Sequence, residues 1–433
     1  MCSPGVEQAS EGVLTMKKSI LATVVLLVAV TATACGGGGD GDVSIDTDRA
    51  RPELLYLGSA TGITALAPAR GHVRFQQAAA VPSRDWSVLY TTTNDGVTTT
   101  LRTLDPATGE EVAHRSIPGS FAVRTVSDDG ALVALTPLAP IGHDTYHPAP
   151  KDPTPLVIVR RDDPEPQVLA VPGNVEPEAF SLSGDALFVI DFVPPLAPER
   201  YRVARLDLSR GNVDDVRSKE AELQEPMRGT ARAQAVAPDG RRLYTLYRRD
   251  ATPDEPAEAF VHVLDLDAET ASCVDLPPEF ATDPLGAVAV TPSGSTLFVY
   301  SPTVGALAEL DTKRLAVTRT ATVPPPPGAT VSTVRATATG STLYLSVFDR
   351  VAPVTLDDLG AGEWSLAPGE IVGIEPASDD SALYLVLPDR VLVVDPRTFA
   401  SRRELAVPPA SLPVDHVAPA LPPIAPGYVK CAC

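Results

Sequence analysis

Short apolar runs alternate with turns rich in Pro, Asp, Ser and Gly along most of the chain. The clearest copies, "AVAPDGRRLYTLY" and "AVTPSGSTLFVYS", read as one strand, a tight turn and a second apolar strand. The second strand recurs with its Leu at residues 89, 132, 187, 243, 297, 343 and 383. A repeat of roughly 40 to 55 residues is typical of four-stranded propeller blades with loop insertions. The pattern therefore predicts an all-β fold with a single β-propeller.

A third strand follows each copy and ends in an acidic turn, as in "VHVLDLDAET" and "RVLVVDPRT". We expect the Asp of this turn to accept backbone N–H bonds across it. A fourth strand then ends in Pro or another breaker, as in "SRRELAVP". Four strands of this kind make one blade, whose alternate residues pack against the next blade.

These repeats resemble the YVTN-type, WD40-like and lactonase-like propeller repeats, whose core reads like "VAVSPDGKRLYV" followed by "VIDTAT". The copies "AVAPDGRRLYTLY" and "VLVVDPRTFASRRELAVP" are closest, and the resemblance runs from about Leu54 to Pro408. It implies a propeller fold and no particular function, since such repeats serve enzymes and binding scaffolds alike.

The number of blades is seven or eight. The segment 54–68 looks like a second and third strand without a first strand, and "PVDHVAPALPP" (413–423) is the expected closing strand. That count gives eight blades, while seven is the commoner number in the family that the repeats resemble. The only helix-like segment, 217–229, is expected in a loop or an outer strand.

The charge and composition of the chain limit which kinds of partner it can bind. Asp and Glu number 55 against 35 Lys and Arg, which gives a formal charge of -20. A nucleic-acid binder needs clustered Lys and Arg, and the chain has no such cluster, so we expect no nucleic-acid partner. Aromatic residues make up only 5%, so Val, Leu and Ala must fill most of the core.

The N-terminal region reads as a signal peptide with an attachment site. From Met16, two lysines precede a short apolar run and the small residues "ATA", which stand directly before Cys35. This ending resembles the lipobox of bacterial lipoproteins, although Ala32 stands where that family prefers Leu. The resemblance implies cleavage before Cys35, its acylation with palmitate-type chains, and a lipid anchor on the extracytoplasmic side of a cell membrane or outer envelope.

The predicted organisation has four parts. These are a signal peptide (1–34), a lipidated acidic Gly-rich tether (35–52), the propeller (53–425) and a Cys-containing tail (426–433).

Three successive blades carry long loops between their second and third strands, at 136–155, 193–201 and 248–259. Loops on a rigid scaffold carry function, so we expect the ligand face there, unless the loops are insertions without a ligand. The candidate ligand residues in these loops are His143, Asp144, Tyr146, His147, Arg200, Tyr201, Arg248, Arg249 and Asp250. No cofactor is expected, and the alternative is a divalent metal held by His143 and His147.

Three cysteines besides Cys35 remain after removal of the signal peptide. Cys431 and Cys433 can form a bridge with each other, or one of them can pair with Cys273. Metal capture by "CAC" and free thiols are the alternatives that the sequence leaves open.

The first strands "AVAV", "TVRA" and "RAQAVA" are mostly small and apolar, which predicts a central channel without catalytic chemistry. No G-x-S-x-G, H-E-x-x-H or phosphate-loop motif is present, and we assign no catalytic residue. The sequence therefore favours a lipid-anchored, non-catalytic binding or assembly scaffold for a protein or glycan. The alternatives are a lactonase-like or other hydrolase with its site on the loop face, and a metal or redox binding protein.

Overall fold

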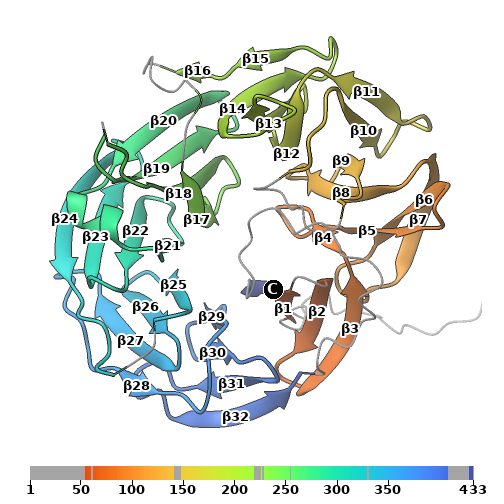
Figure 1. The fold of residues 1–433 in the computed structure, drawn as a ribbon. Helices are drawn as coiled ribbons and strands as arrows, with labels where there is room; N and C mark the ends of the chain where they lie inside the picture. The colour runs from red at the N-terminus through yellow and green to blue at the C-terminus, as the bar shows by residue number, and fades with distance from the viewer. Residues whose placement is uncertain are drawn as a thin grey trace, which may run out of the picture. The chain divides into compact units, whose positions relative to one another are not determined.

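The computed structural model describes residues 54–59, 62–140, 148–218, 226, 229–253, 255–328, 331–407 and 429–432. Eight sheets, each four-stranded apart from one with five strands, surround a common centre as the blades of a β-propeller (Figure 1). We number the blades along the chain. The predicted all-β propeller is confirmed, and of the two predicted blade numbers the structure has eight.

The first four blades contain the following strands. Blade 1 has β1 (Leu54–Ser59), β2 (Gly62–Ala67), β3 (His72–Ala78) and β33 (Val429–Ala432). Blade 2 has β4 (Val81–Pro82), β5 (Leu89–Asn94), β6 (Thr98–Leu104) and β7 (Glu111–Pro118). Blade 3 has β8 (Phe121–Val126), β9 (Leu132–Pro137), β10 (Thr154–Arg160) and β11 (Gln167–Val171). Blade 4 has β12 (Asn174–Phe180), β13 (Ala186–Val193), β14 (Arg200–Asp207) and β15 (Val213–Asp215).

The other four blades follow the same plan. Blade 5 has β16 (Arg217–Ser218), β17 (Thr230–Val236), β18 (Arg242–Arg249), β19 (Glu258–Asp265) and β20 (Thr270–Asp275). A 3₁₀ helix, η2 (Pro278–Thr282), leads to blade 6, with β21 (Ala287–Val290), β22 (Thr296–Ser301), β23 (Ala306–Asp311) and β24 (Ala316–Thr322). Blade 7 has β25 (Val334–Ala338), β26 (Thr342–Val347), β27 (Arg350–Thr355) and β28 (Ser365–Leu366). Blade 8 has β29 (Gly373–Pro376), β30 (Leu383–Val386), β31 (Arg390–Val394) and β32 (Ser401–Ala406).

The ring closes through the last described strand. β33 pairs antiparallel with β1, from Leu54 opposite Ala432 to Leu57 opposite Val429, and is the innermost strand of blade 1. The sequence predicts the closing strand at 413–423 and a tail after 425, but the structure makes the closing strand from 429–432. The four residues of this strand are too few to carry a recognisable copy of the repeat, which is why the pattern points elsewhere.

The helix-like segment starts as an edge strand. Arg217 and Ser218 form β16, which lies parallel to β20 at the outer edge of blade 5. This confirms an outer-strand position for the start of the segment, while most of 219–228 is outside the described residues. No helix among the described residues is long and apolar enough to cross a membrane.

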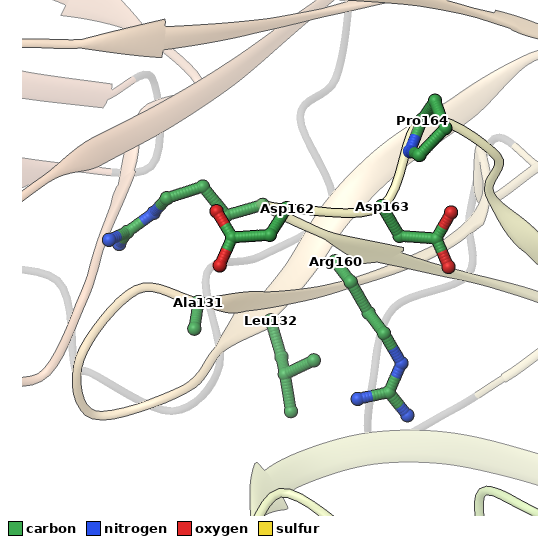
Figure 2. A pocket seen from close by; sticks show the side chains of 7 residues that line it. Ala131, Leu132, Arg160, Asp162, Asp163 and Pro164 are labelled. Atoms are coloured by element: carbon green, nitrogen blue, oxygen red, sulfur yellow. The ribbon is translucent and has the colours of Figure 1, made fainter. Parts of the chain in front are cut away.

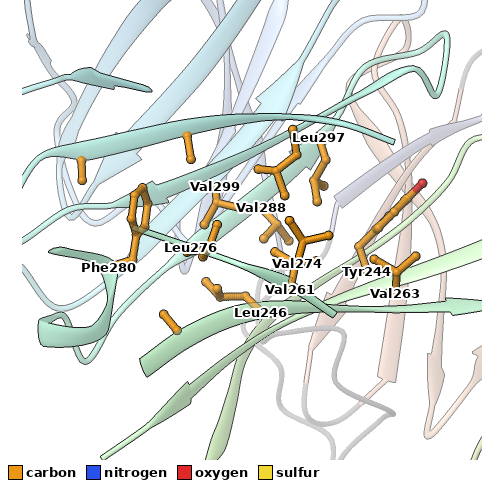
Figure 3. Packing of buried hydrophobic residues seen from close by; sticks show 14 of the residues in the cluster. Tyr244, Leu246, Val261, Val263, Val274, Leu276, Phe280, Val288, Leu297 and Val299 are labelled. Atoms are coloured by element: carbon orange, nitrogen blue, oxygen red, sulfur yellow. The ribbon is translucent and has the colours of Figure 1, made fainter. Parts of the chain in front are cut away.

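The core consists of eight apolar layers, one between each pair of neighbouring blades, including blades 8 and 1. Figure 3 shows the layer between blades 5 and 6, where Val261 and Val274 meet Val288 and Val299. Alternate residues of each strand therefore face opposite neighbours, and Val, Leu and Ala dominate, as the composition predicts. A ring built in this way holds its innermost strands at defined positions around the centre.

The acidic turns behave as predicted. In blade 2 the Asp105 carboxylate accepts backbone N–H bonds from Ala107 (2.8 Å) and Thr108 (2.9 Å). The same pattern recurs at Asp207, Asp265, Asp311 and Asp395. These bonds favour the ionised carboxylate and hold the pKa of Asp311 and Asp395 below the usual range.

Candidate functional site

The three long loops lie where the sequence predicts them. They join β9 to β10, β13 to β14 and β18 to β19, the second and third strands of blades 3, 4 and 5. His143, Asp144, Tyr146 and His147 lie outside the described residues, so the predicted metal pair stays a prediction. Among the residues that the structure describes, no group of three or more His, Cys, Asp and Glu side chains could hold a metal ion.

One buried amide joins the loops of blades 3 and 4. Asn174, at the start of β12, donates from Nδ2 to the carbonyl oxygens of Ala149 (3.0 Å) and Pro195 (2.9 Å), one in each loop. The backbone N–H of Lys151 also donates to the Pro195 carbonyl (3.4 Å). Because the prolines around these contacts fix φ, the described parts of the two loops are held in one preorganised arrangement.

Tyr201, a predicted ligand residue, joins blades 4 and 5. Its hydroxyl donates to the Gly229 carbonyl (3.2 Å), and its ring lies between Phe192 (centroids 6.0 Å apart) and Tyr247 (5.8 Å). Tyr247 in turn stacks on Phe260 at 5.6 Å. These four rings lie on the strands that flank the long loops of blades 4 and 5, and their packing stabilises the ends of both loops.

The predicted arginines differ in their contacts. Arg200 is exposed at the start of β14. Arg248 pairs through Nη2 with Asp250 Oδ1 (2.7 Å) and donates from Nε to the Ala281 carbonyl (2.7 Å). Arg249 pairs with Glu255 (3.7 Å) in the following loop and with Glu258 at the start of β19. The structure therefore brings Arg248 and Asp250 together and leaves Arg249 in a local ion-pair group.

A charged group that the sequence analysis missed lies on the innermost strands of the same three blades. β8, β12 and β17 each contain a β-bulge, and the residue at the bulge is Arg124, Glu178 and Arg232, respectively. These residues are equally spaced in the sequence and take equivalent places in their blades. A β-bulge changes the direction in which a side chain points, and bulges often lie beside functional sites. The expected small, apolar centre is thus wrong for this sector.

Arg124 and its partners form a buried ion-pair network. The Arg124 side chain is 2% exposed, and its Nε lies 3.3 Å from Oε2 of Glu176. The other Glu176 oxygen pairs with Nζ of Lys151, which comes from the blade 3 loop. The network therefore connects the long loop to the innermost strands of blades 3 and 4.

Glu178 is the chemically unusual member of the group. It is 9% exposed, and burial raises its pKa to about 7, against the opposing effects of Arg124 and of the hydrogen bond from Gln234. Gln234 Nε2 donates to Oε1 (3.3 Å), while Oε2 is buried without a hydrogen-bond partner among the described residues. A carboxyl of this kind exchanges its proton near neutral pH.

On the opposite face, the turns after the first strands of blades 2, 3 and 5 meet one another. Arg84 Nη1, from the blade 2 turn, donates to the Gly240 carbonyl of blade 5 (2.7 Å). Asp128 of blade 3 lies beside both residues and attracts the Arg84 charge, while burial lowers the Arg84 pKa. These contacts join three blades on the face away from the long loops.

That second face carries a pocket of about 410 Å³, shown in Figure 2. It is lined by Ala131, Leu132 and the β10–β11 turn 160–164. Leu132 is the first residue of β9, so the pocket lies at the other end of this strand from the long loop.

The remaining His and Cys residues that the structure describes lie within strands of the blades. His262 on β19 is 4% exposed, and burial lowers its pKa to about 4, so it is neutral at neutral pH. Cys273 lies on β20 opposite His262, whereas Cys431 lies on β33 opposite Leu55 in blade 1. Cys35 and Cys433 are outside the described residues, and the disulfide stays a prediction.

The sequence matches no protein-family model and no curated protein. Among solved structures, it is similar to the dihydro-heme d1 dehydrogenase NirN in complex with DHE (16% identity, TM-score 0.49, 82% of this chain and 73% of that chain). It is also similar to the periplasmic gluconolactonase PpgL of Pseudomonas aeruginosa (17%, 0.41, 80% and 99%) and to the Dos1 propeller (11%, 0.48, 77% and 86%). At these identities and scores the similarity says nothing about ligand or activity.

Proposed function

We propose that this chain is a lipid-anchored, extracytoplasmic propeller that binds a protein or glycan partner through the long loops of blades 3, 4 and 5. The observation that carries the proposal is the Asn174 amide, which holds two of these loops together. Preorganised loops lose little conformational entropy on binding, so they suit a recognition surface. We call the face that bears these loops the loop face.

Apolar side chains at loop tips add to this argument. Val97 (75% exposed), Leu196 (65%) and Val304 (40%) all lie between second and third strands, in blades 2, 4 and 6. Exposed apolar groups at the tips of ordered loops are favourable contacts for a partner protein or the apolar face of a sugar.

Site-specific photocrosslinking in intact cells tests the partner proposal. A photoreactive residue at Leu196 should capture a partner, whereas the same residue at Leu366, equally exposed at 64% on the outer strand β28, should not. Protease and glycosidase treatment of the adduct then distinguishes a protein from a glycan. Equal capture from both positions, or none from Leu196, would contradict the proposed loop face.

The lipid anchor is supported by the lipobox-like "ATAC" and the basic, apolar segment before it. Metabolic labelling with an alkyne analogue of palmitate should mark the wild-type chain, and Cys35→Ser should abolish the label and release the chain from the membrane fraction. Cys273→Ser, which alters a thiol within blade 5, is the matched control and should keep the label. Labelling that survives Cys35→Ser would contradict the anchor site.

Hydrolysis of a lactone or ester is a second candidate function, favoured by the pKa of about 7 at Glu178. A buried carboxyl that titrates near neutral pH is suited to general acid–base catalysis. A panel of lactones and esters should be turned over by the wild-type chain and not by Glu178→Gln. Equal turnover by both would remove Glu178 from any such role.

A further inference from the structure

Arg232 occupies the bulge of β17, the innermost strand of blade 5, near the end of that strand that leads to the loop face. Its side chain is half-buried, and Nε is shielded from solvent without a hydrogen-bond partner. Within the described part of the chain, Arg232 makes neither a hydrogen bond nor an ion pair. A guanidinium has five N–H donors, so this position has unused donor capacity.

A second arginine lies on the neighbouring strand, since Arg248 on β18 pairs with Thr230, two residues before Arg232. Burial lowers the Arg232 pKa, and the neighbouring Arg248 charge lowers it further, against weaker opposing effects of Asp250 and Tyr201. Arg248 already uses Nε for the Ala281 carbonyl and Nη2 for Asp250. The Asp250 side chain pairs with Arg248 and is 76% exposed, so solvent screens its charge and it offsets the Arg232 charge only weakly.

Such an arrangement lowers the stability of the folded chain. A half-buried charge without a partner costs desolvation energy, and the nearby like charge adds repulsion. A neutral side chain at this position would avoid both costs. Residues that lower stability in this way are typical of sites that are completed by a ligand.

We propose that Arg232, with Arg248, binds the oxyanion group of a small organic ligand, either a carboxylate or a phosphate, that reaches it from the loop face. The proposal rests on the binding face proposed above and names the ligand chemistry of one part of it. The planar guanidinium fork matches two oxygens of a carboxylate or phosphate, and the anion would neutralise the repulsion between the two arginines.

Binding of inorganic phosphate and of citrate by the full chain tests the proposal. Thermal unfolding is measured in each anion and in chloride at the same ionic strength, and calorimetry gives the affinity. We expect at least one of the two anions to raise Tm above the chloride value. Arg232→Gln should abolish this gain and weaken binding by about tenfold or more. A larger gain with phosphate or with citrate assigns the site to phosphates or to carboxylates.

A second readout does not depend on finding the right anion. In chloride alone, Arg232→Gln should unfold at the same or a higher temperature than wild type, because it removes an unpaired charge. Arg402→Gln is the control: Arg402 lies on the outer strand β32 of blade 8, where it pairs with Asp395, so this variant should keep the anion response.

Several results would overturn the proposal. A lower Tm of Arg232→Gln in chloride would mean that Arg232 is already paired within the chain. A wild-type chain that responds to neither anion, or an anion response that survives Arg232→Gln, would remove the oxyanion site. Crosslinking from Leu196 tests the partner proposal separately, so either proposal can fail without the other.

Discussion

Glu178 offers a quantitative test of the charged group. Its ordinary pKa is 4.5, and burial raises this value to about 7 in the folded chain. Below about pH 4.5 both the folded and the unfolded chain hold the proton, so the carboxyl adds no cost. As pH rises to about 7, the unfolded chain releases the proton first and folding loses stability. Above pH 7 the full cost, about 3 kcal/mol, applies.

Glu178→Gln removes the titrating group while keeping its size. We expect the free energy of unfolding of this variant minus that of wild type to increase by about 2 to 3 kcal/mol between pH 5 and pH 8, because only wild type loses stability over this range. The comparison between two pH values cancels any constant effect of the lost carboxylate on Arg124. Urea unfolding followed by tryptophan fluorescence at each pH measures the difference.

Two further variants sharpen the test. Glu404→Gln replaces an exposed carboxyl on β32 and reports the effect of removing a surface charge. Gln234→Leu removes the hydrogen bond that favours the ionised carboxylate, so it should extend the loss of stability to higher pH. A pH-independent difference between Glu178→Gln and wild type, or one of opposite sign, would refute the reasoning.

Three other outcomes follow from the fold. Deleting residues 429–433 removes the innermost strand of blade 1 and should lower Tm by many degrees in calorimetry, because blade 1 loses its pairing with the end of the chain; an unchanged Tm would show that β33 does not hold the ring. Gly130→Ala should destabilise the chain by about 2 kcal/mol or more in urea unfolding, since the residue has φ +66° and its Cβ would lie 2.1 Å from Val88 Cγ1. Asn174→Ala should leave the propeller folded but lower the free energy of unfolding by about 1 to 3 kcal/mol, because two loops lose their common hydrogen-bond donor. It should also reduce crosslinking from Leu196; unchanged crosslinking would show that binding does not depend on the contact between the two loops.

Turn chemistry made the blades predictable. Asp105 and its counterparts sit in a local pattern of a few residues, and Gly130 and Gly240 take positive φ in the turns where the sequence places them. Such signals depend on neighbours in the chain alone, so they can be recognised without tertiary contacts. The long loops were predictable for the same reason, because their length is visible between two recognisable strands.

The charged group on the innermost strands of blades 3, 4 and 5 was not predictable by the same means. Alternation assigns a residue to one side of a strand only while the register is regular, and each bulge shifts it by one residue. Arg124, Glu178 and Arg232 all lie at such shifts, so their direction depends on pairing with the second strand. Their equal spacing is visible in the sequence and is the signal that could have identified them.

Blade 1 joins the two ends of the propeller, since β1 starts the described chain and β33 ends it. This pairing has the largest sequence separation in the fold, and contacts of that kind form late. The apolar layer between blades 1 and 2 can form early in synthesis, because all its residues lie in 54–107, but the layer between blades 8 and 1 must wait for residues 372–407, and the β1–β33 pairing for 429–432. Until then, an incomplete sheet edge is exposed to other chains. A chain cut short by a few residues should therefore be recognised as unfinished by proteases, so that only complete propellers accumulate.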